Sequence, residues 1–172
     1  MPHFCENCGA PWKPQLTADR HHQQCSSCKH IRFLDPKVAV ALLLITESDT
    51  VLLARRKANP GVGSWALPGG FVDRGETLEN AAQREGREEL GLELAINHLV
   101  GLYSWTGEPL ILAVYSVSPL AGEARAGDDV DQIGYFLPDA LPVLAFEHDR
   151  IIIETAFSDK NARQCSSRYR TL

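Results

Sequence analysis

The sequence lacks any apolar stretch long enough to span a bilayer. Its longest apolar run, from Val38 to Ile45, has the length of a strand, whereas a membrane-spanning helix needs roughly 20 residues. The N-terminal residues MPHFCENCGAPW contain no basic segment followed by an apolar run, so a secretory signal peptide is not expected. Together these absences predict a cytoplasmic protein without a membrane partner.

The sequence also lacks an excess of basic residues. It contains 17 Lys and Arg against 22 Asp and Glu, a formal net charge of −5. Proteins that bind nucleic acid usually carry a basic patch or stripe, so nucleic acid is not favoured as a partner. A small anionic ligand held by a local site is compatible with this balance. The 172 residues are enough for one well-buried domain with a small appendage.

Cysteine is almost confined to the start of the chain, which holds four of the five cysteines. Cys5 and Cys8 have the same two-residue spacing as Cys25 and Cys28, a pattern typical of a structural zinc site. Four thiolates complete a tetrahedral shell, so this zinc is expected to have no catalytic role. Two disulfides or a redox-active pair are the alternatives, and both are less common in a cytosolic setting.

The composition changes at Asp35 and Pro36, after which aliphatic residues become frequent. We therefore interpret residues 1–34 as a zinc ribbon, 35–160 as the main domain, and 161–172 as a flexible tail with little apolar periodicity. A segment as small as 1–34 cannot bury a sufficient core, so a metal is its expected support.

Apolar periodicity and turn residues predict a mixed sheet with a few helices. The expected strands are 37–45 and 51–56, joined as a hairpin, two short strands within 65–72, and 96–105, 109–117 and 132–137. The expected helices are 77–90 and 147–157, with a helical turn within 138–144. Thr77 and Gly91 suit the start and the end of the first helix. This order predicts an α/β or α+β sandwich.

The helix expected at 77–90 carries several glutamates close together. Glu85, Glu88 and Glu89 lie three and four residues apart, so they share one face of the helix. Like charges at this spacing are destabilising unless a cation lies among them. Arg84 can pair with Glu88, and Mg²⁺ or Mn²⁺ take carboxylate oxygens as ligands. The pattern alone leaves two interpretations open, a metal site or a solvated charged face.

The wider segment GGFVDRGETLENAAQREGREELG, from Gly69 to Gly91, resembles the signature motif of the Nudix hydrolases. The residues that carry the resemblance are Gly70-x5-Glu76-x7-Arg84-Glu85-Gly86-x-Glu88-Glu89-x-Gly91-Leu92. One residue departs from the pattern, because the family usually has an aliphatic residue at the position of Gly86. Glycine within a helix costs roughly 1 kcal/mol relative to alanine, but the acidic residues are unaffected.

The resemblance implies an α/β/α sandwich that uses Mg²⁺ or Mn²⁺ to hydrolyse a nucleoside diphosphate linked to another group. It implies that Glu85, Glu88 and Glu89 bind the catalytic metal, that Arg84 orients a glutamate, and that the backbone of Gly70 contributes an oxygen. It also implies a homodimer.

Such enzymes often take a further carboxylate from the loop before a late strand that ends in two aromatic residues. Counting back from Tyr135 and Phe136 makes Asp129 the candidate for an auxiliary ligand or base, ahead of Asp128 and Asp131. A solvated turn is the alternative interpretation of this loop.

A four-cysteine ribbon before a Nudix domain is similar to the NADH pyrophosphatases and to a related group that acts on ADP-ribose or FAD. The NADH group carries a Ser-Gln-Pro-Trp stretch after the motif, which this sequence lacks, so the second group is favoured. Tyr103, Trp105 and Phe146 are candidates for stacking an adenine or flavin ring, with a core role as the alternative. Arg55 and Arg56 are candidates for phosphate contact, with a surface role as the alternative.

Two other functions stay open at this point. One is a nucleoside triphosphate pyrophosphatase of the same fold, and the other is a non-catalytic module that senses a nucleotide. The complete set of motif glutamates argues against the sensing module, because a pure sensor need not keep all of them.

Overall fold

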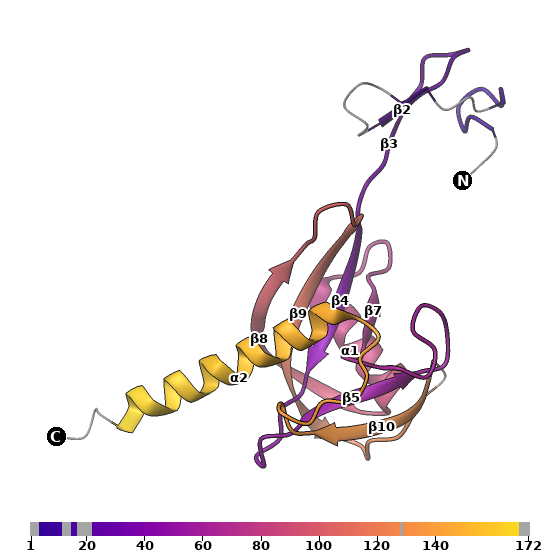
Figure 1. Cartoon of the computed structure of the whole chain (residues 1–172). Coiled ribbons are helices and arrows are strands. Elements are labelled where there is room, and N and C mark those ends of the chain that lie inside the picture. The colour runs from indigo at the N-terminus through magenta and orange to yellow at the C-terminus, as the bar shows by residue number, and fades with distance from the viewer. Residues whose placement is uncertain (1–3, 12–14, 17–21, 128, 169–172) are drawn as a thin grey trace. The chain divides into compact units, whose positions relative to one another are not determined.

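The structure is a computed structural model that describes residues 4–11, 15–16, 22–127 and 129–168. The chain divides into two compact units, Met1–Pro36 and Lys37–Leu172, which we call the cysteine unit and the main unit (Figure 1). The division lies close to the boundary expected after residue 34. Among the described residues, no helix has the length and apolar character that crossing a membrane requires.

The cysteine unit contains a three-stranded antiparallel sheet in the order β1-β2-β3. Its strands are β1 (Gln15–Leu16), β2 (His22–Gln24) and β3 (Ile31–Phe33). The two cysteine pairs have the same backbone turn, because Gly9 N donates to Cys5 O and Lys29 N donates to Cys25 O. Both donors also have a positive φ, 67° for Gly9 and 63° for Lys29.

The main unit is built on two sheets, with strand orders β7-β4-β9-β8 and β10-β5-β6 (Figure 1). Their strands are β4 (Lys37–Leu43), β5 (Val51–Arg56), β6 (Trp65–Ala66), β7 (Gly69–Phe71), β8 (Glu93–Tyr103), β9 (Leu110–Ala121) and β10 (Val130–Phe136). β4 and β9 run parallel, and the other pairs are antiparallel. The predicted mixed sheet is therefore confirmed.

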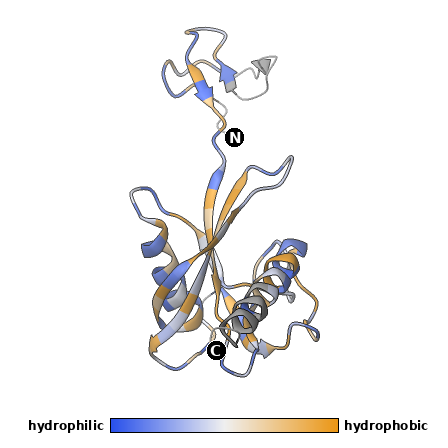
Figure 2. Ribbon diagram, turned by 90° about the vertical axis from the view of Figure 1, so that its left-hand side faces the viewer, coloured by the Kyte–Doolittle hydropathy of each residue, from blue (hydrophilic) through white to orange (hydrophobic). Residues whose placement is uncertain are grey.

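Two helices enclose these strands, α1 (Leu78–Leu90) and α2 (Glu147–Arg168), and Figure 2 shows the strands between them. Successive residues of a strand face opposite sides of its sheet, and β4 follows this rule. Val40 belongs to the apolar cluster that includes Ala81 of α1, whereas Ala41 belongs to the cluster that includes Ile152 of α2. The α/β/α sandwich implied by the resemblance is confirmed.

The first helix begins and ends where the sequence predicted. Thr77 Oγ1 accepts a hydrogen bond from Asn80 N at 3.2 Å, which satisfies one of the free N–H groups at the start of α1. At the other end Gly91 has a φ of 66° and its N–H donates to Arg87 O. α2 is longer than expected: residues 161–168, assigned above to a flexible tail, are helical, and 169–172 lie outside the described residues.

The hairpin expected between residues 37–45 and 51–56 forms only next to its turn, where Ile45 and Val51 make an antiparallel bridge. β4 and β5 are joined next to their turn, where Leu52 N donates to Leu44 O at 3.0 Å, and they then enter different sheets. The reason is that both edges of β4 are occupied, one by β7 and the other by β9. β5 pairs instead with β10 and β6.

Candidate active site

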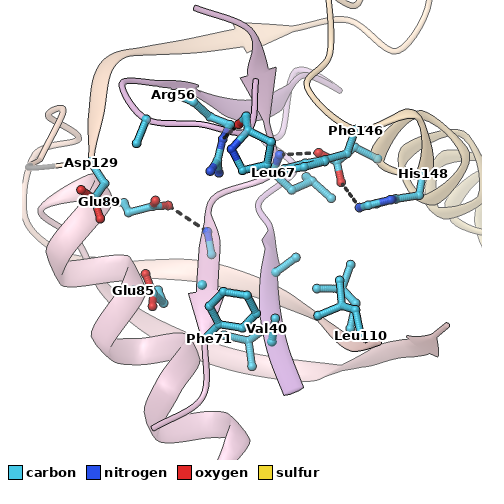
Figure 3. A pocket seen from close by; sticks show the side chains of 18 of the residues that line it. Val40, Arg56, Leu67, Phe71, Glu85, Glu89, Leu110, Asp129, Phe146 and His148 are labelled. Atoms are coloured by element: carbon cyan, nitrogen blue, oxygen red, sulfur yellow. Dashed lines mark hydrogen bonds and ion pairs between the residues drawn. The ribbon is translucent and has the colours of Figure 1, made fainter. Parts of the chain in front are cut away.

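A pocket of about 520 Å³ lies in the main unit, lined by residues of β4, β7, β9, α1 and the start of α2. Figure 3 shows Glu85, Glu89 and Asp129 on one side of it, and Phe146 and His148 on the other. We call these two groups the acidic end and the aromatic end. The pocket therefore brings several residues singled out from the sequence into one place.

The acidic end is built on one face of α1. Glu85 and Glu89 are one turn apart, and each is 8% exposed. The pKa of Glu89 is raised to about 7, chiefly by burial; the bond from Gly69 opposes this rise, and the charges of Glu85 and Asp129 add to it. The pKa of Glu85 is also raised, first by burial, with smaller contributions from Glu88 and Asp129. Two buried carboxyl groups and a third nearby thus form a site that favours a cation.

Two glycines of β7 allow close approaches at the acidic end, one to α1 and one to β4. Gly69 N donates to Glu89 Oε2 at 2.8 Å. Gly69 has a φ of 150°, and a Cβ there would lie 2.9 Å from Ala41 Cα. A Cβ on Gly70 would lie 2.7 Å from the carboxyl carbon of Glu85. The absence of a side chain at Gly70 therefore lets the Glu85 carboxyl group lie directly against β7, and its absence at Gly69 lets β7 lie close to the backbone of β4.

Arg84 holds neighbouring glutamates in place, and its donors are bonded within the protein. Its Nε and Nη2 donate to the two carboxylate oxygens of Glu76, each at 3.1 Å. Its Nη1 donates to Glu85 at 2.7 Å and to Glu88 at 3.0 Å, and Nη2 donates also to Phe71 O at 2.9 Å. All five N–H donors of the guanidinium are then used. The pKa of Arg84 is raised, chiefly by the bond to Glu76.

Glu88 differs from its two neighbours. Its side chain is 58% exposed and pairs with Arg84, and it is not among the residues that line the pocket. The structure thus brings together Glu85, Glu89 and Asp129, and leaves Glu88 at the rim. Within the described part of the chain, the group whose ligand atoms all lie within 4.8 Å of one another consists of the four cysteines, not of carboxylates.

Asp129 is held near the glutamates by a loop that docks on the C-terminal end of α1. Arg125 N donates to Leu90 O at 2.9 Å, and Gly127 N donates to Glu89 O at 3.0 Å. Lys57 N then donates to Asp129 O at 3.0 Å, which fixes the loop to the end of β5. Asp131 points elsewhere, since it pairs with Arg55, and Asp128 lies outside the described residues.

The donor chemistry of the acidic end fits a divalent cation. Carboxylate and carbonyl oxygens are the ligands that Mg²⁺ and Mn²⁺ prefer, and Glu85, Glu89, Asp129 and the backbone of Gly70 all line this part of the pocket. A divalent ion stabilises most strongly those carboxylates that are buried and repel one another.

The two adjacent arginines of β5 have different surroundings. Arg55 donates to both oxygens of Asp131, at 2.7 and 3.0 Å, and does not line the pocket. Arg56 lines the pocket, and its Nε donates to Pro60 O at 2.7 Å. Because the charge of Arg56 lowers the pKa of both Glu89 and Asp149, Arg56 is within electrostatic reach of both ends of the pocket.

Phe146 and His148 of the aromatic end belong to a longer stack of flat groups. Trp105 stacks on Tyr103 with ring centroids 6.3 Å apart and on His148 at 4.3 Å. His148 stacks on Phe146 at 5.3 Å, and the Arg56 guanidinium lies 5.2 Å from the Phe146 centroid. The three aromatic residues proposed from the sequence therefore lie in one stack, but of the three only Phe146 lines the pocket, and the ring faces are largely covered within the stack.

Two residues of the aromatic end were not predicted from the sequence. His148 lies within the stack, and Asp149 beside it is a buried carboxyl group that lines the pocket. The available signal was helical spacing. Asp149 precedes Ile152 and Ile153 by three and four residues, and both isoleucines are buried, so the helix carries an acidic residue on its buried face.

The four cysteines form a second candidate site in the cysteine unit. Cys5 Sγ lies 3.8 Å from Cys28 Sγ, and Cys8 Sγ lies 3.8 Å from Cys25 Sγ. These distances are far longer than the roughly 2.05 Å of a disulfide. They match the edge of about 3.8 Å expected for a tetrahedron with Zn–S bonds of about 2.3 Å. The cluster is compatible with a zinc ribbon.

Comparisons with known proteins agree with the fold and with the motif. A family model described as "NUDIX domain" matches residues 35–155. An ADP-ribose pyrophosphatase of Methanocaldococcus jannaschii is 41% identical over 128 residues, which cover 72% of this chain and 75% of that protein. The NAD-capped RNA hydrolase NudC of Pseudomonas aeruginosa is 32% identical over 146 residues, covering 82% of this chain but 50% of its own.

Among solved structures, the crystal structure of a NUDIX hydrolase from Nitrosomonas europaea superposes with a TM-score of 0.82. It is 25% identical and covers 94% of this chain and 93% of its own. With the motif glutamates on α1, the matching family model and this shared fold, the chain belongs to the Nudix hydrolase family.

Proposed function

We propose that this protein is a Mg²⁺- or Mn²⁺-dependent pyrophosphohydrolase. Its substrate would be a nucleoside diphosphate linked to another moiety, of the ADP-ribose, FAD or NADH class. The observation that carries the proposal is that one pocket combines buried glutamates, Arg56 and an aromatic end. The name of the Methanocaldococcus jannaschii relative, an ADP-ribose pyrophosphatase, favours ADP-ribose as the first substrate to test.

The residues of the acidic end would hold the divalent ion. Glu85, Glu89 and the carbonyl of Gly70 are the proposed ligands, with Glu88 as a further ligand from the rim. When bound, the ion supplies positive charge that neutralises a pyrophosphate and lowers the pKa of a coordinated water. Arg84 keeps Glu85 and Glu88 in place through the bonds described above.

The other residues act on the substrate. Arg56 offers its remaining N–H donors to phosphate oxygens, since its Nε is already bound to Pro60 O. Asp129 is the candidate base, because it is the exposed carboxylate beside two buried ones. The water oxygen forms a bond to phosphorus as the bridging P–O bond breaks. The products are a nucleoside monophosphate and the phosphorylated remainder.

We further propose that Cys5, Cys8, Cys25 and Cys28 bind one structural zinc ion. The S···S distances near 3.8 Å and the equal backbone turns support this assignment. A closed four-thiolate shell leaves no position for substrate. The zinc would therefore stabilise the cysteine unit without taking part in hydrolysis.

The purified protein should be incubated with ADP-ribose, FAD, NADH and a set of nucleoside triphosphates, with Mg²⁺ or Mn²⁺, and the products identified. We expect AMP from members of the first group and no turnover after addition of EDTA. Release of pyrophosphate from triphosphates alone would assign the protein to the triphosphate pyrophosphatases. Binding of these ligands without turnover under any metal would favour the sensing module.

A further inference from the structure

Asp149 is a buried carboxyl group that the proposed hydrolysis does not use. It lies in the first turn of α2, is 2% exposed, and lines the pocket. Its Oδ2 accepts a hydrogen bond from Leu67 N at 3.0 Å. Its Oδ1 lies 3.6 Å from Nε2 of His148, which is too long for a good hydrogen bond. Oδ2 thus has one of its two lone pairs engaged by the backbone, and Oδ1 keeps its hydrogen-bonding capacity.

The aromatic end offers little open ring face for stacking. Trp105 is covered by Tyr103 and His148, and Phe146 is covered by His148 and the Arg56 guanidinium. A ligand ring entering from the acidic end therefore meets the edges of this stack and apolar side chains of the sheets, such as Leu67 and Leu112. Recognition of a ring here then depends on the polar groups that line this part of the pocket, of which Glu108 is exposed and Asp149 is buried.

Asp149 lies at the end of the pocket opposite the acidic end, where the phosphates of a substrate would react. Figure 3 shows Glu85 and Glu89 on one side and His148 on the other. Arg56 interacts electrostatically with both Glu89 and Asp149. A substrate whose diphosphate lies between the acidic end and Arg56 would therefore extend its nucleoside toward Asp149.

We propose that Asp149 is a specificity-determining residue that recognises the 6-amino edge of an adenine ring at the aromatic end of the pocket. The inference rests on the proposed function, because it requires that the adenosine part of the substrate enters this pocket.

The chemical reason is the order of donor and acceptor on the carboxyl group. Burial raises the pKa of Asp149 to about 7, although the bond from Leu67 N and the charge of Arg56 oppose this shift. A bound ligand excludes water and favours the neutral form further. Since the Leu67 N–H holds Oδ2 as an acceptor, the proton belongs on Oδ1. A donor beside an acceptor complements adenine, which presents the N1 acceptor beside the 6-amino donor.

Other bases present a different edge. Hypoxanthine has an N1–H donor beside an oxygen acceptor, the reverse of adenine, and the neutral carboxyl group with its proton on Oδ1 would leave both polar atoms unpaired. A buried site that is built to bond one pattern rejects an analogue that lacks it, because its own polar groups are then left unsatisfied.

The test compares ADP-ribose with inosine diphosphate ribose as substrates, and AMP with IMP as ligands in calorimetry. We expect the wild type to prefer the adenine member of each pair by at least about 10-fold. Asp149→Asn should keep the preference, because an amide also places a donor beside an acceptor. Asp149→Ala should bring the ratio close to 1. Asp139→Ala removes an exposed loop carboxylate and is the matched control.

The outcomes separate this inference from the proposed function. If neither ADP-ribose nor inosine diphosphate ribose is hydrolysed but AMP still binds more tightly than IMP, the proposed function fails and the role of Asp149 stands. If ADP-ribose is hydrolysed but the wild type does not discriminate between the bases, the role of Asp149 is overturned. A loss in Asp149→Ala that affects both bases equally would mean that Asp149 only fastens α2 to Leu67, and would also overturn it. Should Asp149→Ala not fold, the wild-type ratios and Asp149→Asn still decide.

Discussion

The backbone N–H of Gly69 donates to Oε2 of Glu89 at 2.8 Å, and this bond joins β7 to α1 at the acidic end of the pocket. It holds one carboxylate oxygen in place and leaves the other available. Glu89 is therefore positioned by the backbone, whereas Glu85 and Glu88 are positioned by Arg84. The glutamates of the motif thus have separate supports, and their substitution should have separable consequences.

We predict that Glu85→Gln, Glu88→Gln and Glu89→Gln each lower kcat by at least about 100-fold, the upper range for loss of a group that merely supports a metal ligand. The three variants should differ in their thermal stability. Glu89→Gln should leave the thermal midpoint unchanged or higher at pH 7.5, because it removes a buried carboxylate while a glutamine oxygen can still accept from Gly69. Exposed Glu93 supplies the control substitution Glu93→Gln. Near-normal turnover in Glu88→Gln would show that Glu88 is not a metal ligand.

We predict that Arg84→Lys lowers kcat about 10- to 100-fold, as expected when the partner of a metal ligand is lost. A lysine cannot reproduce the paired bonds to Glu76 while also reaching Glu85, because its ammonium is a single point rather than a planar fork. Arg87→Lys on the same helix is the control, since Arg87 is exposed and makes one long contact to Glu93 at 3.4 Å. Equal activities of the two variants would show that Arg84 does not organise the site.

We predict that the stabilisation by Mg²⁺ or Mn²⁺ grows as the pH rises. The pKa of Glu89 is raised from 4.5 to about 7, so between these values the folded state binds more protons than the unfolded state. Without metal, the contribution of Glu89 to stability then falls as the pH rises from about 4.5 to about 7. The ion needs the deprotonated carboxylate. The metal-induced rise in the thermal midpoint should therefore be larger at pH 8 than at pH 6.

The matched variant for this measurement is Glu89→Gln, which should lose most of the pH-dependent metal effect. Its metal-free stability should still decline toward pH 7, because Asp149 has a pKa raised from 3.8 to about 7 and a slope of the same sign. A metal-induced shift that is constant from pH 6 to pH 8 in the wild type would count against Glu89 as a ligand.

Much of the main unit could be predicted because its signals are local. Thr77, Gly91 and the glutamate spacing define α1 within one stretch of sequence, and the structure agrees at both ends. The pairing of β5 could not be predicted in this way, since it depends on β7 and β9 occupying the edges of β4. Pairing partners distant in sequence leave no signal in a short window.

The choice between neighbouring residues shows the same limit. Arg55 and Arg56 are equivalent in the sequence, but successive residues of a strand face opposite sides, and only the fold decides that Arg56 lines the pocket while Arg55 pairs with Asp131. Asp149 looks like an ordinary acidic residue in the first turn of a helix. Its burial becomes visible once Leu67 packs against that turn.

The departure of Gly86 from the family pattern has a steric explanation. A Cβ at this position would lie 2.9 Å from Leu94 Cγ, with Leu94 Cδ1 still closer. Leu94 is 1% exposed and belongs to the core cluster that includes Ala81 and Leu90 of α1. Glycine therefore allows β8 to pack closely on α1, which offsets the propensity cost expected from the sequence.

We predict that Gly86→Ala lowers the free energy of unfolding by about 1 kcal/mol. Alanine gains roughly 1 kcal/mol of helix propensity, but overpacking of a core typically costs 1–3 kcal/mol. In a double-mutant cycle with Leu94→Ala, the cost of Gly86→Ala should disappear or change sign, with a coupling of more than about 0.5 kcal/mol. Denaturant unfolding measures all four states. A stabilising Gly86→Ala in the wild-type background would contradict the steric explanation.

We predict about one zinc ion per chain by elemental analysis, lost on substitution of Cys5 or Cys25 by serine. These two cysteines are the buried members of the cluster, 2% and 1% exposed, so their loss should unfold the cysteine unit as well as release the metal. Hydrolysis should persist, because every residue proposed for catalysis lies in the main unit. Cys165→Ser, which changes a cysteine that is not one of the proposed four ligands, is the control. A well-folded wild type without zinc would refute the ribbon, and loss of turnover with zinc while the main unit stays folded would give the cysteine unit a role in catalysis.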